Sequence, residues 1–423
     1  MEKKINFKPT KIACYTGYIT QAIVINLAPV FFVIFSDKYG IDNARLGTII
    51  LMNFIVQILT DVVAVKLTTK VSLRTCAVWA HILAFTGLML LGILPAVMPD
   101  AFVGLFIASF IYSVGGGLIE VVISPIVDAI PVEVSEEVGG AKAAAMSLLH
   151  SFYCWGQMTV VLLSTLILSL VGDGNWIYIP FIWALIPFVN IFAFMRVPFP
   201  QFISESERTP VKKIVTTRLF LVCAILMICS GASELAVAQW ASMLAEKGLG
   251  VNKVVGDILG PCAFAFCMGI GRMVYGILGS KLPFAKSLLG CSILCVCGYL
   301  MITLFQNPVV ALLGCSVCGI AVSLMWPGVL SLTSGEFPFG GAVLFSLLAI
   351  CGDIGCSLGP WLTGFVSNNI NTDALANLTP FAGLAPEQIA LKCGLFVTGI
   401  FPVIMIFAVI VFGIIRKKKT VQK

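Results

Sequence analysis

Apolar stretches of about twenty residues recur along the whole chain, and they constrain the fold more than any other feature. Each is long enough to cross a bilayer as an α-helix. Lipid offers the backbone no hydrogen-bond partners, so only helices and closed β-barrels can span it. The sequence lacks the alternating segments of a barrel, and 11% of its residues are charged, against about 25% in soluble domains. We therefore predict an all-α, polytopic membrane protein.

Twelve of these stretches are predicted to span the membrane, six on each side of a polar gap. They lie at about 12–35, 45–66, 75–97, 101–127, 143–171, 176–196, 218–244, 254–280, 285–305, 308–334, 341–367 and 392–415. Prolines, serines and charges make the gap, residues 198–217, typical of a cytoplasmic linker. We expect one six-helix bundle over 1–197 and a second over 218–423, which ends in a basic cytoplasmic tail.

Basic residues mark one side of the predicted spans. With the amino end in the cytoplasm, twenty of the 26 Lys and Arg residues fall in cytoplasmic segments, five in outer segments, and Arg272 inside a span. This distribution follows the positive-inside rule. We expect a multi-pass protein of the cytoplasmic (inner) membrane with both termini in the cytoplasm. The net charge of +6 reflects this bias, so we expect no nucleic-acid partner.

The fifteen cysteines lie almost entirely in apolar stretches, where a thiol behaves as a small hydrophobic side chain. Cys315 and Cys318 have C-x-x-C spacing but no histidine or acid beside them. The sequence also lacks an H-E-x-x-H or G-x-S-G motif. We therefore predict no metal, no cofactor and no enzymatic activity, and we expect a monomer whose partners are a small-molecule substrate and the lipid bilayer.

Two matched stretches predict that the halves are repeats. Gly117 precedes Pro125 by eight residues, and Gly319 precedes Pro327 by eight. The segment "SLLHSFYCWG" in the fifth predicted span also matches "SLLAICGDIG" in the eleventh. Two repeats of six spans in the same orientation form the arrangement of transporters whose site lies between the halves, at the middle of the membrane.

Two loop sequences resemble the major facilitator superfamily. Its cytoplasmic motif, G-x3-D-R-x-G-R-R, is similar to "GILGSKLPFAK", where Gly276 keeps the glycine, Ser280 replaces the acid and Lys281 is basic. The segment "VKLTTKVSLR" keeps the basic Lys70 and Arg74. This resemblance implies two six-helix bundles related by a pseudo-two-fold axis, with transport by alternating access.

Within that superfamily, three segments resemble the fucose permease branch of sugar–proton symporters. They are "GGGLIEVVISP" in span 4, "LLHSFYCWG" in span 5 and "MWPGVLSL" in span 10. The branch has an aspartate in span 1 that takes part in sugar and proton handling. Here span 1 has no acid, and its polar groups are Gln21 and Asn26. The resemblance implies a sugar–proton symporter, but neither the identity of the substrate nor a mechanism divided between acids in spans 1 and 4 carries over.

Charged side chains inside predicted spans are the first candidates for function, because a charge costs ~2.5–3.5 kcal/mol at the middle of a bilayer on insertion scales. Glu120 is the strongest candidate, since burial lets a carboxyl hold a proton near neutrality and release it when water arrives. The alternative is a structural glutamate bonded to a neighbouring helix. The predicted proton-coupling residues are Glu120, Glu234 and Asp353.

Amides and aromatic rings suit a solute with hydroxyl groups and apolar faces. The predicted substrate-binding residues are Gln21, Asn26, Glu120, His150, Tyr153, Glu234, Gln239, Trp240 and Trp326. Three of them have structural alternatives: an interfacial belt for Trp240, helix packing for Trp326 and a satisfied core histidine for His150. Asp353 can instead bind a coupling cation or pair with Arg272. The predicted gating residues are Asp61, Lys70, Arg74, Arg272 and Lys281.

The pattern favours proton-coupled uptake of a monosaccharide or similar small hydroxylated solute. A proton moving inward gains ~2.3 kcal/mol per 100 mV, so one coupling carboxylate suffices for accumulation. Two alternatives stay open. A proton/drug antiporter would use Glu234 with aromatic residues for a hydrophobic cation, and a sodium-coupled sugar porter would use Asp353 as a cation ligand.

Overall fold

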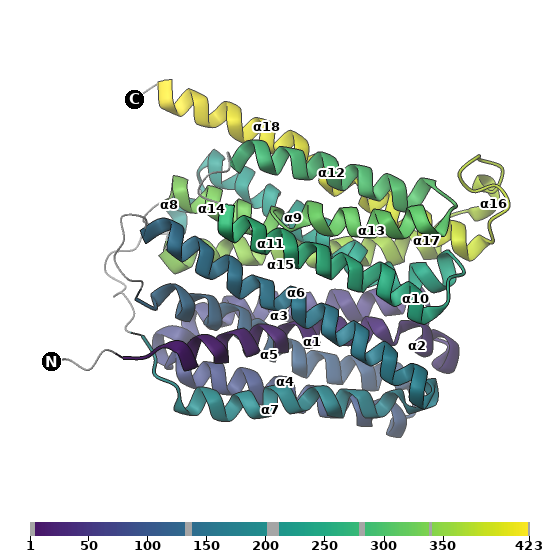
Figure 1. Cartoon of the computed structure of the whole chain (residues 1–423), viewed down its shortest axis with the longest axis horizontal. Helices are drawn as coiled ribbons and strands as arrows, with labels where there is room; N and C mark the ends of the chain where they lie inside the picture. Colours follow the sequence, from purple (N-terminus) through teal and green to yellow (C-terminus); the bar gives the residue numbers. More distant parts are fainter. Residues whose placement is uncertain (1–4, 132–137, 201–210, 279–283, 338–340, 422–423) are drawn as a thin grey trace. The chain divides into compact units, whose positions relative to one another are not determined.

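A computed structural model describes residues 5–131, 138–200, 211–278, 284–337 and 341–421. These ranges are almost entirely helical and contain no strand (Figure 1). Within them, 12 helices or joined helices are long and apolar enough to cross a membrane. The predicted all-α class and the predicted number of spans are therefore confirmed.

The first half of the chain contains seven α-helices. They are α1 (Lys8–Val30), α2 (Phe32–Tyr39), α3 (Asn43–Lys70), α4 (Leu73–Val97), α5 (Ala101–Ala129), α6 (Val138–Val171) and α7 (Ile179–Arg196), with a 3-10 turn, η1 (Asp173–Tyr178), before α7.

After α8 (Val211–Val215), the second half contains ten more α-helices and two π-helical turns. They are α9 (Arg218–Met243), η3 (Leu244–Gly248), α10 (Lys253–Asp257), η4 (Ile258–Cys262), α11 (Ala263–Leu278), α12 (Phe284–Leu304), α13 (Pro308–Val322), α14 (Met325–Glu336), α15 (Gly341–Asn369), α16 (Thr372–Leu375), α17 (Pro386–Thr398) and α18 (Ile400–Val421).

Among the described residues, predicted span 8 joins α10 to α11 through the π-helical turn η4, and three other predicted spans are interrupted between two helices. Span 1 breaks at Phe31, span 10 between Val322 and Met325, and span 12 at Gly399. A proline lies within four residues of each break, at 29, 327 and 402. Proline has no backbone N–H to donate to the carbonyl four residues earlier, which weakens the helix at these points.

Contacts between residues divide the chain into two compact units. Unit 1 consists of Met1–Phe31, Ile55–Glu207 and Arg272–Ser280, and unit 2 of Phe32–Phe54, Arg208–Gly271 and Lys281–Lys423. The helices α3 and α11 therefore contribute one part to each unit. The predicted bundles, 1–197 and 218–423, stay a prediction, and residues 201–210 of the predicted linker lie outside the described part of the chain.

Glycines bring the helices of each unit close together. In unit 1, α4 packs against α5 and α7, and a Cβ at Gly115 would lie 2.6 Å from the backbone nitrogen of Ala84. In unit 2, α9 packs against α15, and a Cβ at Gly355 would overlap the carbonyl oxygen of Ile228. Small residues at membrane helix interfaces permit such backbone contact.

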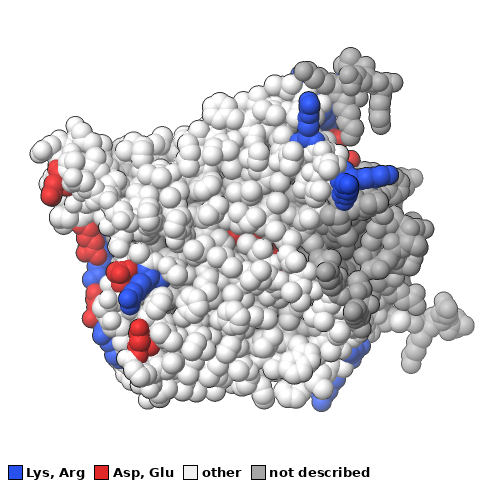
Figure 2. Space-filling model, turned by 180° about the vertical axis from the view of Figure 1, so that it is seen from behind, with Lys and Arg blue, Asp and Glu red and all other residues white. Residues whose placement is uncertain are grey.

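The surface is apolar over a broad area. On the face shown in Figure 2, Lys, Arg, Asp and Glu gather near the ends of the helices, and the surface between them is almost free of charge. Large apolar side chains are exposed along the helices, including Leu59 at 60%, Val63 at 61% and Phe407 at 64%. Such a surface is stable in lipid and costly in water.

Candidate functional site

Glu120 meets an amide pair in unit 1. The side-chain Nε2 of Gln21, on α1, donates to Oε1 of Gln57 on α3 at 2.8 Å and to Oε2 of Glu120 on α5 at 3.4 Å. A primary amide has two N–H donors, so one nitrogen can serve both oxygens. Gln21 is 3% exposed and Gln57 is fully buried, whereas Glu120 is half-buried. The Gln21 amide is thus a neutral donor shared by two acceptors, the Glu120 carboxylate and the Gln57 oxygen.

Two glycines make room for this group. A Cβ at Gly116 would lie 2.9 Å from Oε1 of Gln21, and a Cβ at Gly117 would lie 3.1 Å from the backbone of Gln57. Hydrogen in place of a methyl group therefore lets α5 approach α1 and α3 one turn before Glu120. The glycine run explains how the carboxylate reaches the Gln21 amide.

Gln57 is absent from the residues predicted to be functional, although the sequence contains a signal for it. Asn53, Gln57 and Asp61 follow one another at four-residue intervals, which places them on one face of a helix. All three are buried, at 5%, 0% and 0% exposure. A polar stripe in an apolar span indicates a face turned away from lipid. Asp61, predicted as a gating residue, lies on this stripe.

Other predicted substrate residues make contacts between α1 and the helices α5 and α6. The Tyr18 hydroxyl lies 2.8 Å from Oγ of Ser124 on α5, and its ring lies edge-on to His150 of α6, with 5.0 Å between ring centroids. Nδ2 of Asn26 donates to the Tyr153 hydroxyl oxygen at 3.2 Å. The structure thus pairs Gln21 with Glu120, Asn26 with Tyr153 and Tyr18 with His150, across α1, α5 and α6.

Arg272 belongs to unit 1, although it lies on α11. It is 3% exposed, and its Nη1 lies 3.4 Å from the carbonyl oxygen of His150 and 3.3 Å from Sγ of Cys154. The guanidinium therefore places a positive charge beside α6. Arg272 was predicted as a gating residue, and that role stays a prediction.

The predicted residues of unit 2 lie on tightly packed helices. Glu234 and Gln239 on α9 are 5% and 1% exposed, and Asp353 on α15 is 2% exposed. Trp240 is fully buried, and its indole Nε1 donates to the carbonyl oxygen of Pro360 at 2.9 Å. Because its N–H is used by the neighbouring helix, Trp240 has the contacts of a packing residue.

Trp326 packs against Gly352, the residue before Asp353. Its six-membered ring occupies the space that a Cβ at Gly352 would need, so α14 and α15 meet at the residue before the acid. The ring is half-buried. This position fits both interpretations of Trp326, an aromatic surface near an acid and an ordinary helix contact.

Two basic side chains cap helix ends. Arg74 donates to the carbonyl oxygens of Met195 at 2.7 Å and Val197 at 2.8 Å, at the end of α7. Lys392 is fully buried and donates to the carbonyl oxygens of Ile302 and Phe305, at the end of α12. Cations at a helix C-terminus bond its last carbonyls and oppose the negative end of its dipole.

The structure describes the side-chain contacts of one of three basic residues predicted to gate transport, Arg74, Lys70 and Lys281. The observed contacts of Arg74 are those of a cap, and its gating role stays a prediction. The side chain of Lys70 and all of Lys281 lie outside the described part of the structure.

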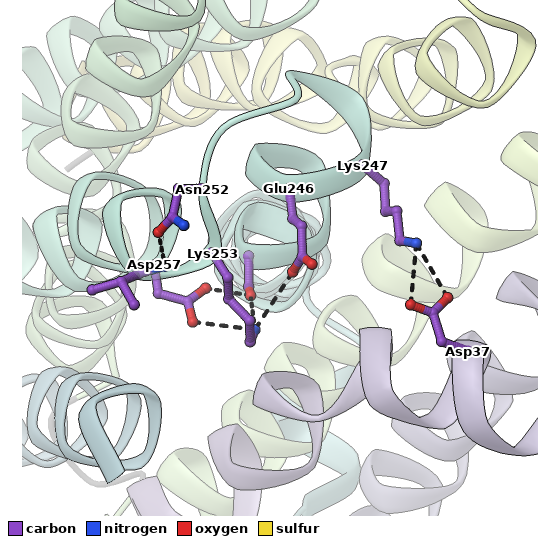
Figure 3. Close-up of polar contacts among 8 residues, drawn as sticks. Asp37, Glu246, Lys247, Asn252, Lys253 and Asp257 are labelled. Atoms are coloured by element: carbon purple, nitrogen blue, oxygen red, sulfur yellow. Dashed lines mark hydrogen bonds and ion pairs between the residues drawn. The ribbon is translucent and has the colours of Figure 1, made fainter. Parts of the chain in front are cut away.

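A polar cluster lies at one end of α9 and α10, within unit 2 (Figure 3). Nζ of Lys253 lies 3.2 Å from the Asp257 carboxylate and 3.8 Å from that of Glu246, and the Ser242 hydroxyl donates to Asp257. Asp257 is 1% exposed and was missed among the charges inside the predicted spans. The four-residue spacing of Lys253 and Asp257 was the available signal.

A second ion pair lies near the cluster in Figure 3. Nζ of Lys247, in η3, is 3.1 Å from Oδ1 of Asp37, just before the end of α2. The Asp37 side chain is 60% exposed and that of Lys247 is 29% exposed. Solvent screens a pair of this kind, so its geometry contributes little to stability.

Comparison with known proteins identifies the family. The model of the Major Facilitator Superfamily matches residues 14–360. No curated protein sequence matches the chain. A variant of the E. coli fucose:proton symporter FucP aligns with a TM-score of 0.64 and 16% identity, over 94% of this chain and 99% of that one.

Two further solved structures have a similar fold. FucP in the outward conformation aligns with a TM-score of 0.62 and 16% identity, over 94% of this chain and 98% of that one. A bacterial homologue of the human lysosomal transporter Spinster, inward-facing and occupied, aligns with a TM-score of 0.68 and 15% identity, over 96% of each chain. The chain belongs to the major facilitator superfamily and is a multi-pass membrane transporter rather than an enzyme.

Proposed function

We propose that this transporter couples inward proton movement to the uptake of a monosaccharide or a similar small hydroxylated solute by alternating access. The observation that carries the proposal is the contact between Glu120 and the Gln21 amide inside unit 1. Two opposing effects act on the protonation of a carboxyl in this position. Burial favours its neutral form, and the amide N–H favours its charged form. A group balanced between the two can bind and release a proton during transport.

The proposed substrate follows from the groups around Glu120. Gln21, Asn26, His150 and Tyr153 can all exchange hydrogen bonds with hydroxyl groups. The rings of Tyr18 and His150 offer apolar faces beside them. The fold shared with the fucose:proton symporter FucP supports the same class of solute. The roles of Trp326 and Asp353 stay predictions, and we assign Trp240 to packing.

The proposed membrane arrangement comes from the sequence. We propose two six-helix bundles, 1–197 and 218–423, and transport by alternating access. We place the protein in the cytoplasmic membrane as a monomer, with both termini in the cytoplasm. The distribution of Lys and Arg residues supports this orientation.

The decisive experiment is uptake into liposomes that contain the purified protein. A panel of radiolabelled monosaccharides would be tested with an inward proton gradient, with the gradient collapsed by an ionophore, and with a sodium gradient instead. We expect at least one sugar to accumulate with the proton gradient alone. Equal uptake after collapse of the proton gradient would disprove symport with protons.

The same liposomes separate the two alternatives. Accumulation that follows the sodium gradient would identify a sodium-coupled porter. Proton-driven export of hydrophobic cations, with no sugar uptake, would identify an antiporter. Empty liposomes and liposomes with the Glu120→Gln variant are the matched controls.

A further inference from the structure

We propose that Gln57 is a positioning residue for proton exchange at Glu120. In this proposal it orients the Gln21 amide so that an N–H, rather than the carbonyl oxygen, faces the carboxylate. The inference rests on the proposed function, because it gives Glu120 a proton to exchange. It adds a residue of α3 that touches neither the proton nor the substrate.

The argument begins with the two ends of the Gln21 amide. Its nitrogen end donates to Gln57 and Glu120, at 2.8 and 3.4 Å. Its oxygen end, Oε1, has no hydrogen-bond partner among the described residues and lies on the Gly116 side of the group. The shorter of the two bonds is the one to Gln57. Gln57 therefore determines which end of the amide lies between α3 and α5.

The orientation matters because the two forms of the Glu120 carboxyl prefer opposite ends of an amide. A carboxylate accepts hydrogen bonds, so it favours the N–H end, whereas a protonated carboxyl can donate to the oxygen end. Holding the N–H end toward Glu120 favours the charged form and thus proton release. Without Gln57, the Gln21 amide could turn over and stabilise the protonated form.

Burial makes the arrangement persistent. Gln21 and Gln57 are 3% and 0% exposed, so water does not replace their mutual bond. A buried amide that loses its partner is costly, by roughly 1–3 kcal/mol. The close approach of Gly117 to the backbone of Gln57 holds α3 against α5. The pair therefore has one favoured arrangement in the folded protein.

Other titratable or charged side chains lie on helices of unit 1 and are unchanged in the test. They are Tyr18 on α1, Asp61 on α3, His81 on α4, His150 on α6 and Arg272 on α11. Any influence that they have on Glu120 is the same in the wild type and in the variants. A difference caused by Gln57 must therefore be measured against a variant that leaves the amide pair intact.

The test is a pH titration of the Glu120 carboxyl by infrared difference spectroscopy on the purified protein. The carbonyl band of protonated Glu120 is identified by its loss in Glu120→Gln. Gln57→Met keeps the length of the side chain and removes the acceptor. In this variant we expect the titration midpoint of Glu120 to move to higher pH by roughly 0.5–1 unit. The reason is that the carboxylate loses a hydrogen bond from a neutral donor, which stabilises its charged form.

Two further variants make the result specific. Thr60→Val is the matched control on α3, because the bond that the structure describes for the Thr60 hydroxyl is to the Val56 carbonyl of its own helix, at 2.8 Å. It should leave the midpoint where it is. Gln21→Met removes the donor itself and should move the midpoint in the same direction as Gln57→Met. It also keeps the test valid if Gln57→Met fails to fold.

An unchanged midpoint in both glutamine variants would overturn the inference, and so would a Glu120 carboxyl that never takes up a proton. The titration needs no substrate, so it separates this inference from the proposed function. If the midpoint moves but no sugar accumulates, the positioning role stands and the substrate proposal fails. If sugar accumulates but the midpoint is unmoved, the proposed function stands and Gln57 is structural.

Discussion

The helix α5 and the pair α13–α14 have the same glycine–proline spacing, but they use it differently. In unit 1, α5 continues through Pro125 as one helix, and Glu120 reaches the Gln21 amide. In unit 2 the corresponding residue is Val322, which is fully buried. It is the last residue of α13, and the helix is interrupted there, before α14 begins at Met325. One copy of the pattern carries a charge and the other a break in the helix. A shared backbone pattern therefore does not predict a shared function.

Gly116 of unit 1 differs from Gly355 and Gly359 of unit 2 in what surrounds it. A Cβ at Gly116 would press on the end of the flexible Gln21 side chain. A Cβ at Gly355 or Gly359 would meet the backbone of α9. The space at Gly116 is filled by a movable polar group, whereas the space at Gly355 and Gly359 is closed by backbone. We infer that glycine substitutions will affect coupling in the first case and folding in the second.

The largest expected effect tests the charge directly. We expect Glu120→Gln to exchange labelled for unlabelled sugar but to lose accumulation, because an amide cannot release a proton. The loss amounts to roughly 50-fold per 100 mV of membrane potential, since a proton gains ~2.3 kcal/mol over that potential. Counterflow and gradient-driven uptake in liposomes measure the two activities. Val322→Ala should accumulate sugar normally, and normal accumulation by Glu120→Gln would make Glu120 a structural residue.

The next effect tests the backbone contact in unit 2. Gly355→Leu should destabilise the protein by about 3 kcal/mol or more, because the new side chain meets the carbonyl oxygen of Ile228, which cannot move aside. Thermal unfolding in detergent measures the loss. Gly290→Leu is the matched control on α12, since no atom lies within 4 Å of a Cβ there. Equal melting temperatures for the two variants would refute the packing argument.

A smaller effect is expected from removing either of two carboxylates shown in Figure 3, one buried and one exposed. Asp257→Ala removes a carboxylate that is 1% exposed and leaves Lys253 without its nearest partner, so we expect a loss of about 3 kcal/mol. Asp37→Ala removes one that is 60% exposed and should cost about 1 kcal/mol or less. The melting temperatures of the two variants provide the comparison. A larger loss for Asp37→Ala would show that its pair with Lys247 has a structural role.

The smallest expected change in stability belongs to Gly116→Ala. Its methyl group would lie 2.9 Å from Oε1 of Gln21, and the flexible amide can shift by a few tenths of an ångström. We expect less than about 1 kcal/mol of destabilisation. The pH profile of uptake should nevertheless change, because the moved amide bonds Glu120 less well. If Gly116→Ala melted at a temperature as low as that of Gly355→Leu and its pH profile were unchanged, the distinction between Gly116 and Gly355 would be wrong.

The fold was largely predictable from the sequence, because the bilayer limits the choices. Apolar length alone located twelve spans, and the polar gap located the middle of the chain. The loop motifs pointed to the superfamily that the family comparison confirms. The helix breaks at Phe31 and Val322 were missed, since a span is recognised by hydropathy whether or not its helix is continuous.

The candidate site was predictable only in part. Glu120 stands out in an apolar stretch because a lone charge there is costly. Gln57 does not stand out, since an uncharged amide costs less and occurs in spans for structural reasons. Its importance depends on Gln21, which is 36 residues away in sequence and 2.8 Å away in space. Asp257 was missed for a similar reason, because its partner Ser242 lies on another helix.

The sequence by itself determined the class of the protein, the number of its spans and the positions of its intramembrane acids other than Asp257. These properties follow from the local cost of placing each residue in lipid, which needs no knowledge of neighbours. Tertiary structure alone decided that Gln21 joins Gln57 to Glu120, that Trp240 packs against α15 and that Arg272 lies beside α6. Hydrogen bonds are short and directional, so partners distant in sequence become known only when the helices are packed.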